Sequence, residues 1–149
     1  MYMESYGIKN TVWKHDMITN QLSYYVYDEK IKNNPDSYYI DKMSLFYKRD
    51  AAQKMANPSI HYEQEIILKS IYSVLISHKT NYRIIISPSY DQIKINQMDL
   101  NYLKSLFGAE NVFDFSGINS FTNDYRNYYE RAHYRPFVCD SILNIIYKL

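Results

Sequence analysis

The hydrophobic residues in the second half of the chain change from helical spacing to strand-like runs. Residues 62–79, "YEQEIILKSIYSVLISHK", place Ile67, Ile71, Val74 and Leu75 on one face of a helix. The run "NYRIIIS" that follows is short and β-branched, which is typical of a buried parallel strand. This part of the sequence therefore predicts a helix followed by a buried strand.

A second helix and strand follow, and the helix has capping residues at both ends. In "NQMDLNYLKSLFG", Asn96 is suited to cap the first turn, and Gly108 lies just past the last turn, where glycine is favoured. The run "NVFDFSG" then predicts another short strand. The apolar residues of the helix form one inward stripe, Leu100, Leu103 and Phe107.

Pro136 predicts the start of the last helix, because proline at the first helical position lacks only an N–H that has no partner there. The helix extends over "PFVCDSILNIIYKL" to the end of the sequence given. Its predicted inward stripe consists of Val138, Ile142, Ile145 and Leu149.

Helices that alternate with buried strands imply right-handed crossovers and a mainly parallel sheet. We therefore predict an α/β fold with a doubly wound sheet flanked by helices. In such sheets functional residues gather beyond the carboxyl ends of the strands. Ser87 and Ser89 follow the first predicted strand, and residues 116–133 follow the second.

The first 60 residues predict a mostly helical N-terminal part. "MITNQLSYYVYDEK" and "DSYYIDKMSLFYK" have helical spacing, and Asn34-Pro35-Asp36 separates them as a break and a cap. The run "GIKNTVW", residues 7–13, is compatible with a strand. With 149 residues and no low-complexity linker, the chain is expected to form one domain over 1–149, helical over 1–60 and α/β over 60–149.

Composition and charge argue against several classes of function. Lys and Arg number 17 against 16 Asp and Glu, with no basic stripe, so no nucleic-acid partner is expected. The single cysteine, Cys139, excludes an internal disulfide and a multi-cysteine zinc site, and we predict no metal and no organic cofactor. The apolar runs are too short to span a bilayer, and the N-terminus lacks an apolar signal-peptide region. We therefore expect a cytoplasmic protein.

Tyrosine is unusually frequent, with 18 residues. An AT-rich genome explains this frequency, because the codons of Tyr, Asn, Ile and Lys are AT-rich. An aromatic surface for a carbohydrate or a partner is the alternative, because tyrosine combines a flat apolar ring with a polar tip.

The stretch "NYYERAHYRP", residues 127–136, contains the strongest candidate chemistry. His133 follows Glu130 by three residues, a spacing that brings both side chains to the same side of a turn. A carboxylate that accepts a hydrogen bond from Nδ1–H fixes the imidazole tautomer and stabilises the imidazolium, so that the other nitrogen can act as a general base. A solvated polar turn before the last helix is the alternative interpretation.

Together with "VFDFSG" and the last helix, this stretch resembles the terminal block of the SGNH (GDSL-like) hydrolase family. In that family a D-x-x-H motif lies between the last strand and the last helix, and some bacterial branches continue it as H-Y-R-P, as residues 133–136 do here. The resemblance implies an SGNH-like α/β sheet over about residues 60–149. It also implies that His133 is the base and that Glu130 takes the place of the orienting aspartate in a Ser-His-Asp triad.

Two features depart from the family pattern. Glutamate is one methylene longer than the usual aspartate. No glycine precedes Asp-Ser or lies in a G-x-S-x-G turn, so the N-terminal nucleophile block is missing and the sheet is expected to be incomplete. Ser87, Ser89 and Asp91 are the candidates for a replacement nucleophile or for the lining of a pocket, although Ser-Pro-Ser is also ordinary turn chemistry.

Two functions follow from these observations. The first is a serine ester hydrolase or O-acyltransferase for an acylated small molecule or carbohydrate, represented by its acid–base part and inactive without a nucleophile. The second is a non-catalytic α/β binding or structural domain. Relatives in the family often work at the cell envelope. An incomplete sheet also leaves an exposed strand edge, which predicts a homodimer.

Overall fold

The N-terminal part consists of one small hairpin and short helices. The structure, a computed structural model, describes residues 14–15, 18 and 22–148, so the strand predicted over 7–13 lies outside the described residues. Asn34 separates the first two helices, because its side-chain oxygen accepts a hydrogen bond from Ser37 N–H at 3.0 Å. The elements are the antiparallel pair β1 (Lys14–His15) and β2 (Leu22–Ser23), then α1 (Tyr25–Asn33), α2 (Pro35–Ile40) and the 3₁₀ helix η2 (Met43–Leu45).

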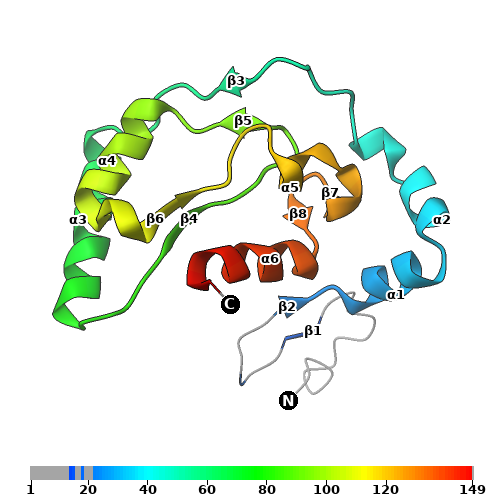
Figure 1. The fold of residues 1–149 in the computed structure, drawn as a ribbon, viewed down its shortest axis with the longest axis horizontal. Helices are drawn as coiled ribbons and strands as arrows, with labels where there is room; N and C mark the ends of the chain where they lie inside the picture. The colour runs from blue at the N-terminus through cyan, green and yellow to red at the C-terminus, as the bar shows by residue number, and fades with distance from the viewer. Residues whose placement is uncertain (1–13, 16–17, 19–21, 149) are drawn as a thin grey trace.

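The middle of the chain contains two pairs of parallel strands and two longer helices (Figure 1). The strand pairs are β3 (Lys54–Met55) with β5 (Ile93–Lys94), and β4 (Ile84–Ile86) with β6 (Val112–Asp114). Helix α3 (Tyr62–Ser77) precedes β4, whereas α4 (Gln97–Phe107) and the 3₁₀ helix η3 (Ala109–Asn111) connect β5 to β6.

Both predicted caps of α4 are present. Asn96 accepts a hydrogen bond from Met98 N–H at 2.8 Å, and Gly108 ends the helix with a φ of 87°. A positive φ of this size suits glycine, because it has no Cβ to clash. Leu100 and Phe107 of the predicted stripe are buried, and Leu103 packs against them.

The C-terminal part ends in a hairpin and a helix. After α5 (Ser120–Asn123) and the 3₁₀ helix η4 (Tyr125–Asn127), strands β7 (Tyr128–Glu130) and β8 (His133–Tyr134) pair antiparallel. The last helix, α6 (Pro136–Tyr147), begins at the predicted proline.

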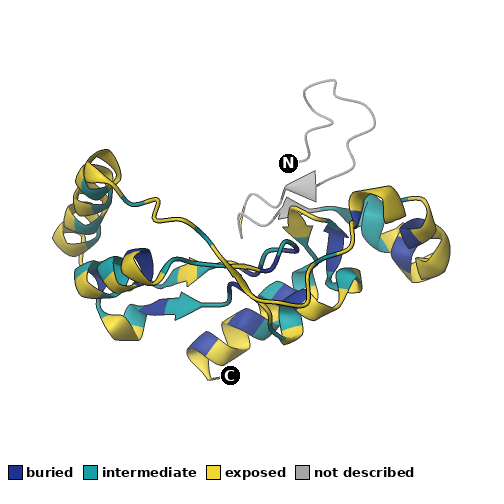
Figure 2. Cartoon of the chain, turned by 90° about the horizontal axis from the view of Figure 1, so that it is seen from above, coloured by how far each residue is buried: buried dark blue, intermediate teal, exposed yellow. Residues whose placement is uncertain are grey.

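Helices cover both faces of the β4–β6 pair. Val112 and Phe113 are neighbours in β6, so their side chains point to opposite faces. Val112 packs with Leu100 and Phe107 of α4, whereas Phe113 packs with the buried side of α6. Figure 2 shows buried residues along the inner side of α6 and exposed residues along its outer side. The local arrangement is therefore helix, sheet, helix.

Two predicted inward stripes were wrong by one position. In α6 the buried residues are Val138, Ile142 and Ile146, whereas Ile145 is exposed; Leu149 lies outside the described residues. Both isoleucines fit a helical period, and the packing against Phe113 decides between them. In α3 the inward residues are Leu68, Tyr72 and Leu75, so only Leu75 of the predicted face packs inward. The other three predicted residues, Ile67, Ile71 and Val74, are exposed.

The prediction of an α/β fold is confirmed at the level of class. Helices combine with four separate two-stranded sheets, two of them parallel, and the described residues do not form one continuous doubly wound sheet. The described strands are only two or three residues long. No helix in the described part of the chain is long and apolar enough to cross a membrane.

Many of the tyrosines lie in a core that joins the N-terminal helices to the β7–β8 hairpin. Tyr38 and Tyr39 of α2 pack with Tyr128 and Tyr129 of β7, and Tyr90 completes this group. Tyr38 donates its hydroxyl to the carbonyl of Tyr129 at 2.8 Å. At these positions tyrosine is a core residue and does not form an exposed aromatic surface.

Candidate functional site

The β7–β8 hairpin places Glu130 and His133 opposite each other in the strand register, with Arg131 and Ala132 between them. Glu130 Oε1 is in hydrogen-bond contact with His133 Nδ1, and Glu130 Oε2 accepts a hydrogen bond from Ala132 N–H at 2.9 Å. The structure thus forms the acid–histidine pair that the spacing suggested, on a short hairpin.

A bulge in β7 explains how the hairpin is anchored. The register shifts between Tyr128 and Glu130, so Tyr129 is an extra residue in its strand. Neighbouring residues of a regular strand point to opposite faces, but Tyr128 and Tyr129 are both almost fully buried. The bulge therefore turns two tyrosines into the core and leaves the Glu130–His133 pair at the surface.

The environment of Glu130 keeps it ionised. Partial burial would raise the pKa of this carboxyl, but the hydrogen bonds from Ala132 N–H and from His133 outweigh that effect. The pKa of Glu130 therefore lies below its usual value, and the side chain is a carboxylate at neutral pH. Among the described residues, His133 has its hydrogen bond at Nδ1, which leaves Nε2 available to accept a proton.

His133 lines an open cavity of about 590 Å³. The ring of Tyr24, just before α1, lies 5.5 Å from the imidazole between centroids, so the N-terminal part supplies one wall. The cavity combines aromatic side chains with the imidazole of His133 and the carboxylate of Asp140. Its lining residues are Tyr24, Tyr129, Ala132, His133, Tyr134, Pro136, Cys139, Asp140 and Leu143.

None of the described residues that line this cavity is a serine. Cys139 contributes the one thiol among the described residues that line the cavity. Burial, together with the nearby Asp140, raises the pKa of its thiol. A raised pKa disfavours the reactive thiolate, so the surroundings of Cys139 do not activate it.

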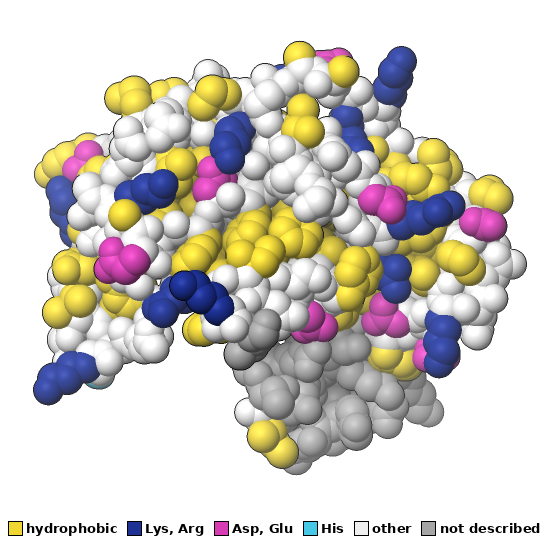
Figure 3. Space-filling view, in the orientation of Figure 1, with side chains coloured by type: hydrophobic (Ala, Val, Ile, Leu, Met, Phe, Trp, Pro, Cys, Tyr) yellow, Lys and Arg dark blue, Asp and Glu magenta, His cyan; other side chains and the backbone are white. Residues whose placement is uncertain are grey.

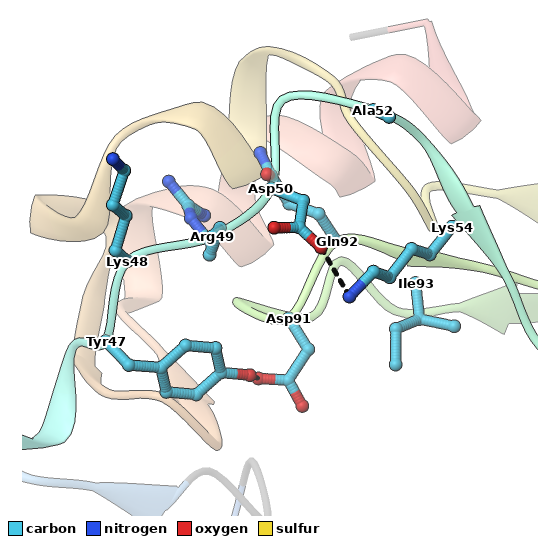
Figure 4. Close-up of a pocket in the computed structure, with 9 residues that line it drawn as sticks. All are labelled: Tyr47, Lys48, Arg49, Asp50, Ala52, Lys54, Asp91, Gln92 and Ile93. Atoms are coloured by element: carbon cyan, nitrogen blue, oxygen red, sulfur yellow. Dashed lines mark hydrogen bonds and ion pairs between the residues drawn. The ribbon is translucent and has the colours of Figure 1, made fainter.

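Ser87, Ser89 and Asp91 lie outside the cavity of His133. Ser87 is exposed, and Ser89 Oγ accepts a hydrogen bond from Asp91 N–H at 3.3 Å, as in an ordinary turn. Asp91 lines a second, smaller cavity, where it accepts the hydroxyl of Tyr47 (Figure 4). The two cavities share no lining residue. The structure therefore does not bring either serine together with His133.

Arg49 lines the second cavity, and the sequence pattern did not predict it as a site residue. Its guanidinium lies 4.2 Å from the centre of the Tyr90 ring and donates to the carbonyls of Tyr90 and Asn123, each at 3.0 Å. Lys54 forms an ion pair with Asp50 at 2.5 Å across the same cavity (Figure 4). Because Arg49 donates to backbone carbonyls, its role here is to hold the loops together.

Gly117, Ile118 and Asn119 follow β6, and their contacts are structural. Asn119 caps α5 by accepting hydrogen bonds from the N–H groups of Phe121 and Thr122, at 2.9 and 3.2 Å. Gly117 has a φ of 80°, and a Cβ there would lie 2.6 Å from the Gln53 side chain. These residues form a tight turn after β6.

Comparisons of the chain with protein-family models, with curated proteins and with solved structures find no match.

Proposed function

We propose that this chain is the acid–base part of an SGNH-like serine ester hydrolase or O-acyltransferase, and that it is inactive by itself. The observation that carries the proposal is the contact of Glu130 with His133, whose imidazole lines a cavity. The fold supports it further, because a parallel strand pair with helices on both faces is the unit from which a doubly wound sheet is built.

The chemistry proposed for the pair is general base catalysis. His133 Nε2 takes the proton of an attacking hydroxyl while that oxygen bonds to the ester carbonyl carbon, and the carboxylate of Glu130 stabilises the imidazolium that forms. The imidazolium then returns the proton to the departing alcohol. These steps need no metal and no organic cofactor.

The cavity lining supports an acylated carbohydrate or a similar small ester as the substrate. Tyr24 and Tyr134, which are partly exposed, contribute aromatic rings beside His133. Such rings pack against the apolar face of a sugar, while their hydroxyls bond to its polar groups. The attacking serine would have to come from outside the described residues, since no serine among them lines this cavity.

The test combines two reagents on the full chain. A fluorophosphonate should give no adduct by intact mass, because no serine among the described residues lines the cavity beside His133. Although serine-dependent turnover is not expected, His133 can still take the proton of an attacking water, so a slow hydrolysis of the activated ester p-nitrophenyl acetate should remain. This slow hydrolysis should fall by a factor of about 10 or more in His133→Ala, because a general base contributes about a hundredfold or more when well placed. His78→Ala, at the end of α3, is the matched control and should keep the rate.

Each outcome bears on the proposal. An adduct that disappears in His133→Ala would establish a working nucleophile and correct the statement that the chain is inactive alone. Equal ester hydrolysis by the wild type and His133→Ala would refute the acid–base role.

A second candidate is a non-catalytic binding domain, which the absence of a serine among the described lining residues favours. In that case an O-acetylated monosaccharide should bind in the cavity with an affinity that depends on Tyr24 and not on His133. Calorimetric titrations of Tyr24→Ala and His133→Ala would separate the two functions.

A further inference from the structure

Helix α3 has apolar residues on two faces, and the chain covers one of them. Leu68, Tyr72 and Leu75 pack toward α4 and β4. On the other face, 58% of Ile67, 45% of Ile71 and 57% of Val74 is exposed. Figure 2 shows α3 at the edge of the molecule without a buried residue, and in Figure 3 hydrophobic side chains reach the surface on the left, over α3. A helix that is apolar on both sides normally has partners on both.

The spacing of the exposed residues fits a second helix. Ile67, Ile71 and Val74 are separated by four and then three residues, which is the alternation of core positions in a two-helix coiled coil. The charged pair in the middle of α3 does not interrupt this stripe. Lys69 and Glu65 lie on another side of the helix and form an ion pair with each other at 3.0 Å.

The charges at the two ends of α3 favour an antiparallel partner of the same sequence. Glu63 lies in the first turn, whereas His78 caps the helix and Lys79 follows it. With Ile71 at a two-fold axis, Glu63 of each copy lies beside His78 and Lys79 of the other. A parallel pair would instead bring Glu63 next to Glu63 and Lys79 next to Lys79. Antiparallel pairing is therefore electrostatically complementary, and it is isologous as a two-fold dimer requires.

We propose that two copies of this chain associate through α3, antiparallel, with Ile67, Ile71 and Val74 at the centre of the interface. The contact is a helix face, which replaces the strand edge from which the sequence predicted a homodimer. The proposal does not depend on the function of His133.

Cysteine cross-linking tests the geometry in the full chain. In a Cys139→Ser background, Ile71→Cys places a thiol beside its own copy at the two-fold axis, within the range that a disulfide can bridge. Under mild oxidation Ile71→Cys should form a covalent dimer, whereas Lys69→Cys, on another side of the same helix, should cross-link at least about tenfold more slowly. Equal rates for the two variants, or no cross-linking of Ile71→Cys, would overturn the proposal.

Sedimentation equilibrium tests the association itself. The wild type should be a dimer, and Ile71→Glu should be a monomer with unchanged helix content by circular dichroism. Glu63→Lys should weaken the dimer about tenfold, and adding Lys79→Glu should restore it, because the swap recreates both ion pairs. A double variant as weak as Glu63→Lys would exclude the antiparallel arrangement. A wild type that stays monomeric at every concentration would overturn the proposal and show that another partner, or none, covers this face.

Discussion

Glu130 is held on two sides by different kinds of donor. One oxygen accepts the backbone N–H of Ala132, and the other is in contact with the imidazole of His133. The backbone bond fixes the direction of the carboxylate, so the imidazole meets an acceptor that is already oriented. This is the arrangement that a histidine needs in order to keep one tautomer.

At this scale we predict the effect of Glu130→Gln. The amide keeps the shape of the side chain but removes the charge that stabilises an imidazolium, so His133-dependent hydrolysis of p-nitrophenyl acetate should fall about tenfold. The free energy of unfolding should change by less than about 1 kcal/mol, because the pair is partly exposed. Glu29→Gln, on the exposed side of α1, is the matched control. An unchanged rate in Glu130→Gln would show that Glu130 does not orient His133 for this reaction.

The pair itself could be predicted from the sequence because its members are three residues apart, and such contacts depend on local backbone alone. Tyr24, in contrast, reaches the cavity from 109 positions before His133. No local pattern marks such a residue, since its role depends on how the tyrosine core packs. The same holds for Arg49, whose carbonyl partners come from two distant turns.

At the scale of elements, Asp99 connects α4 to the segment that leads into α3. It is 4% exposed and accepts hydrogen bonds from Ser59 N–H and Oγ, at 2.8 and 2.9 Å, and from Ile60 N–H at 3.2 Å. Burial would raise the pKa of Asp99, but these bonds outweigh it and the pKa lies below its usual value. The carboxylate thus fixes where α3 begins.

We predict that Asp99→Asn lowers the free energy of unfolding at pH 7 by about 2 kcal/mol, because bonds to a charged acceptor are lost. Since the folded pKa of Asp99 is depressed, its contribution is present above the unfolded pKa and disappears as pH falls through the folded pKa. The difference between wild type and variant should therefore shrink below about pH 4. Urea unfolding at pH 7 and below about pH 4 measures this difference in free energy. Glu110→Gln, whose side chain is exposed, is the control. A difference in free energy that stays constant with pH would contradict the lowered pKa of Asp99.

Helix ends were easier to predict than helix faces. Three residues lie at helix ends for a local reason: a side-chain cap at Asn96, a positive φ at Gly108 and a first helical position at Pro136. The faces of α3 and α6 have more apolar residues than one stripe can hold, so periodicity allowed two orientations. Packing against α4 and Phe113 decided between them.

At the scale of the whole molecule, the N-terminal helices and the site hairpin share one core. The hydroxyl of Tyr39 in α2 lies 2.9 Å from the carbonyl of Arg126 and 3.0 Å from that of Tyr128. Tyr38 reaches the carbonyl of Tyr129 in the same way. Residues of the N-terminal part thus support the strand that ends in Glu130, a connection between distant segments that sequence patterns do not reveal.

We therefore predict that Tyr39→Phe affects the hairpin although it lies in α2. The ring stays in place, but the hydroxyl that reaches the buried carbonyl of Tyr128 and the partly buried carbonyl of Arg126 is lost, which should cost about 1–2 kcal/mol of unfolding free energy. Hydrogen exchange of the β7 amides should accelerate by the factor that corresponds to this loss of free energy, because opening the hairpin requires the same core to loosen. Tyr62→Phe, whose side chain is exposed, should change neither quantity. If exchange in β7 stayed at the wild-type rate while α2 became less stable, the two segments would fold independently, and the wall that Tyr24 contributes would not be coupled to the pair that it faces.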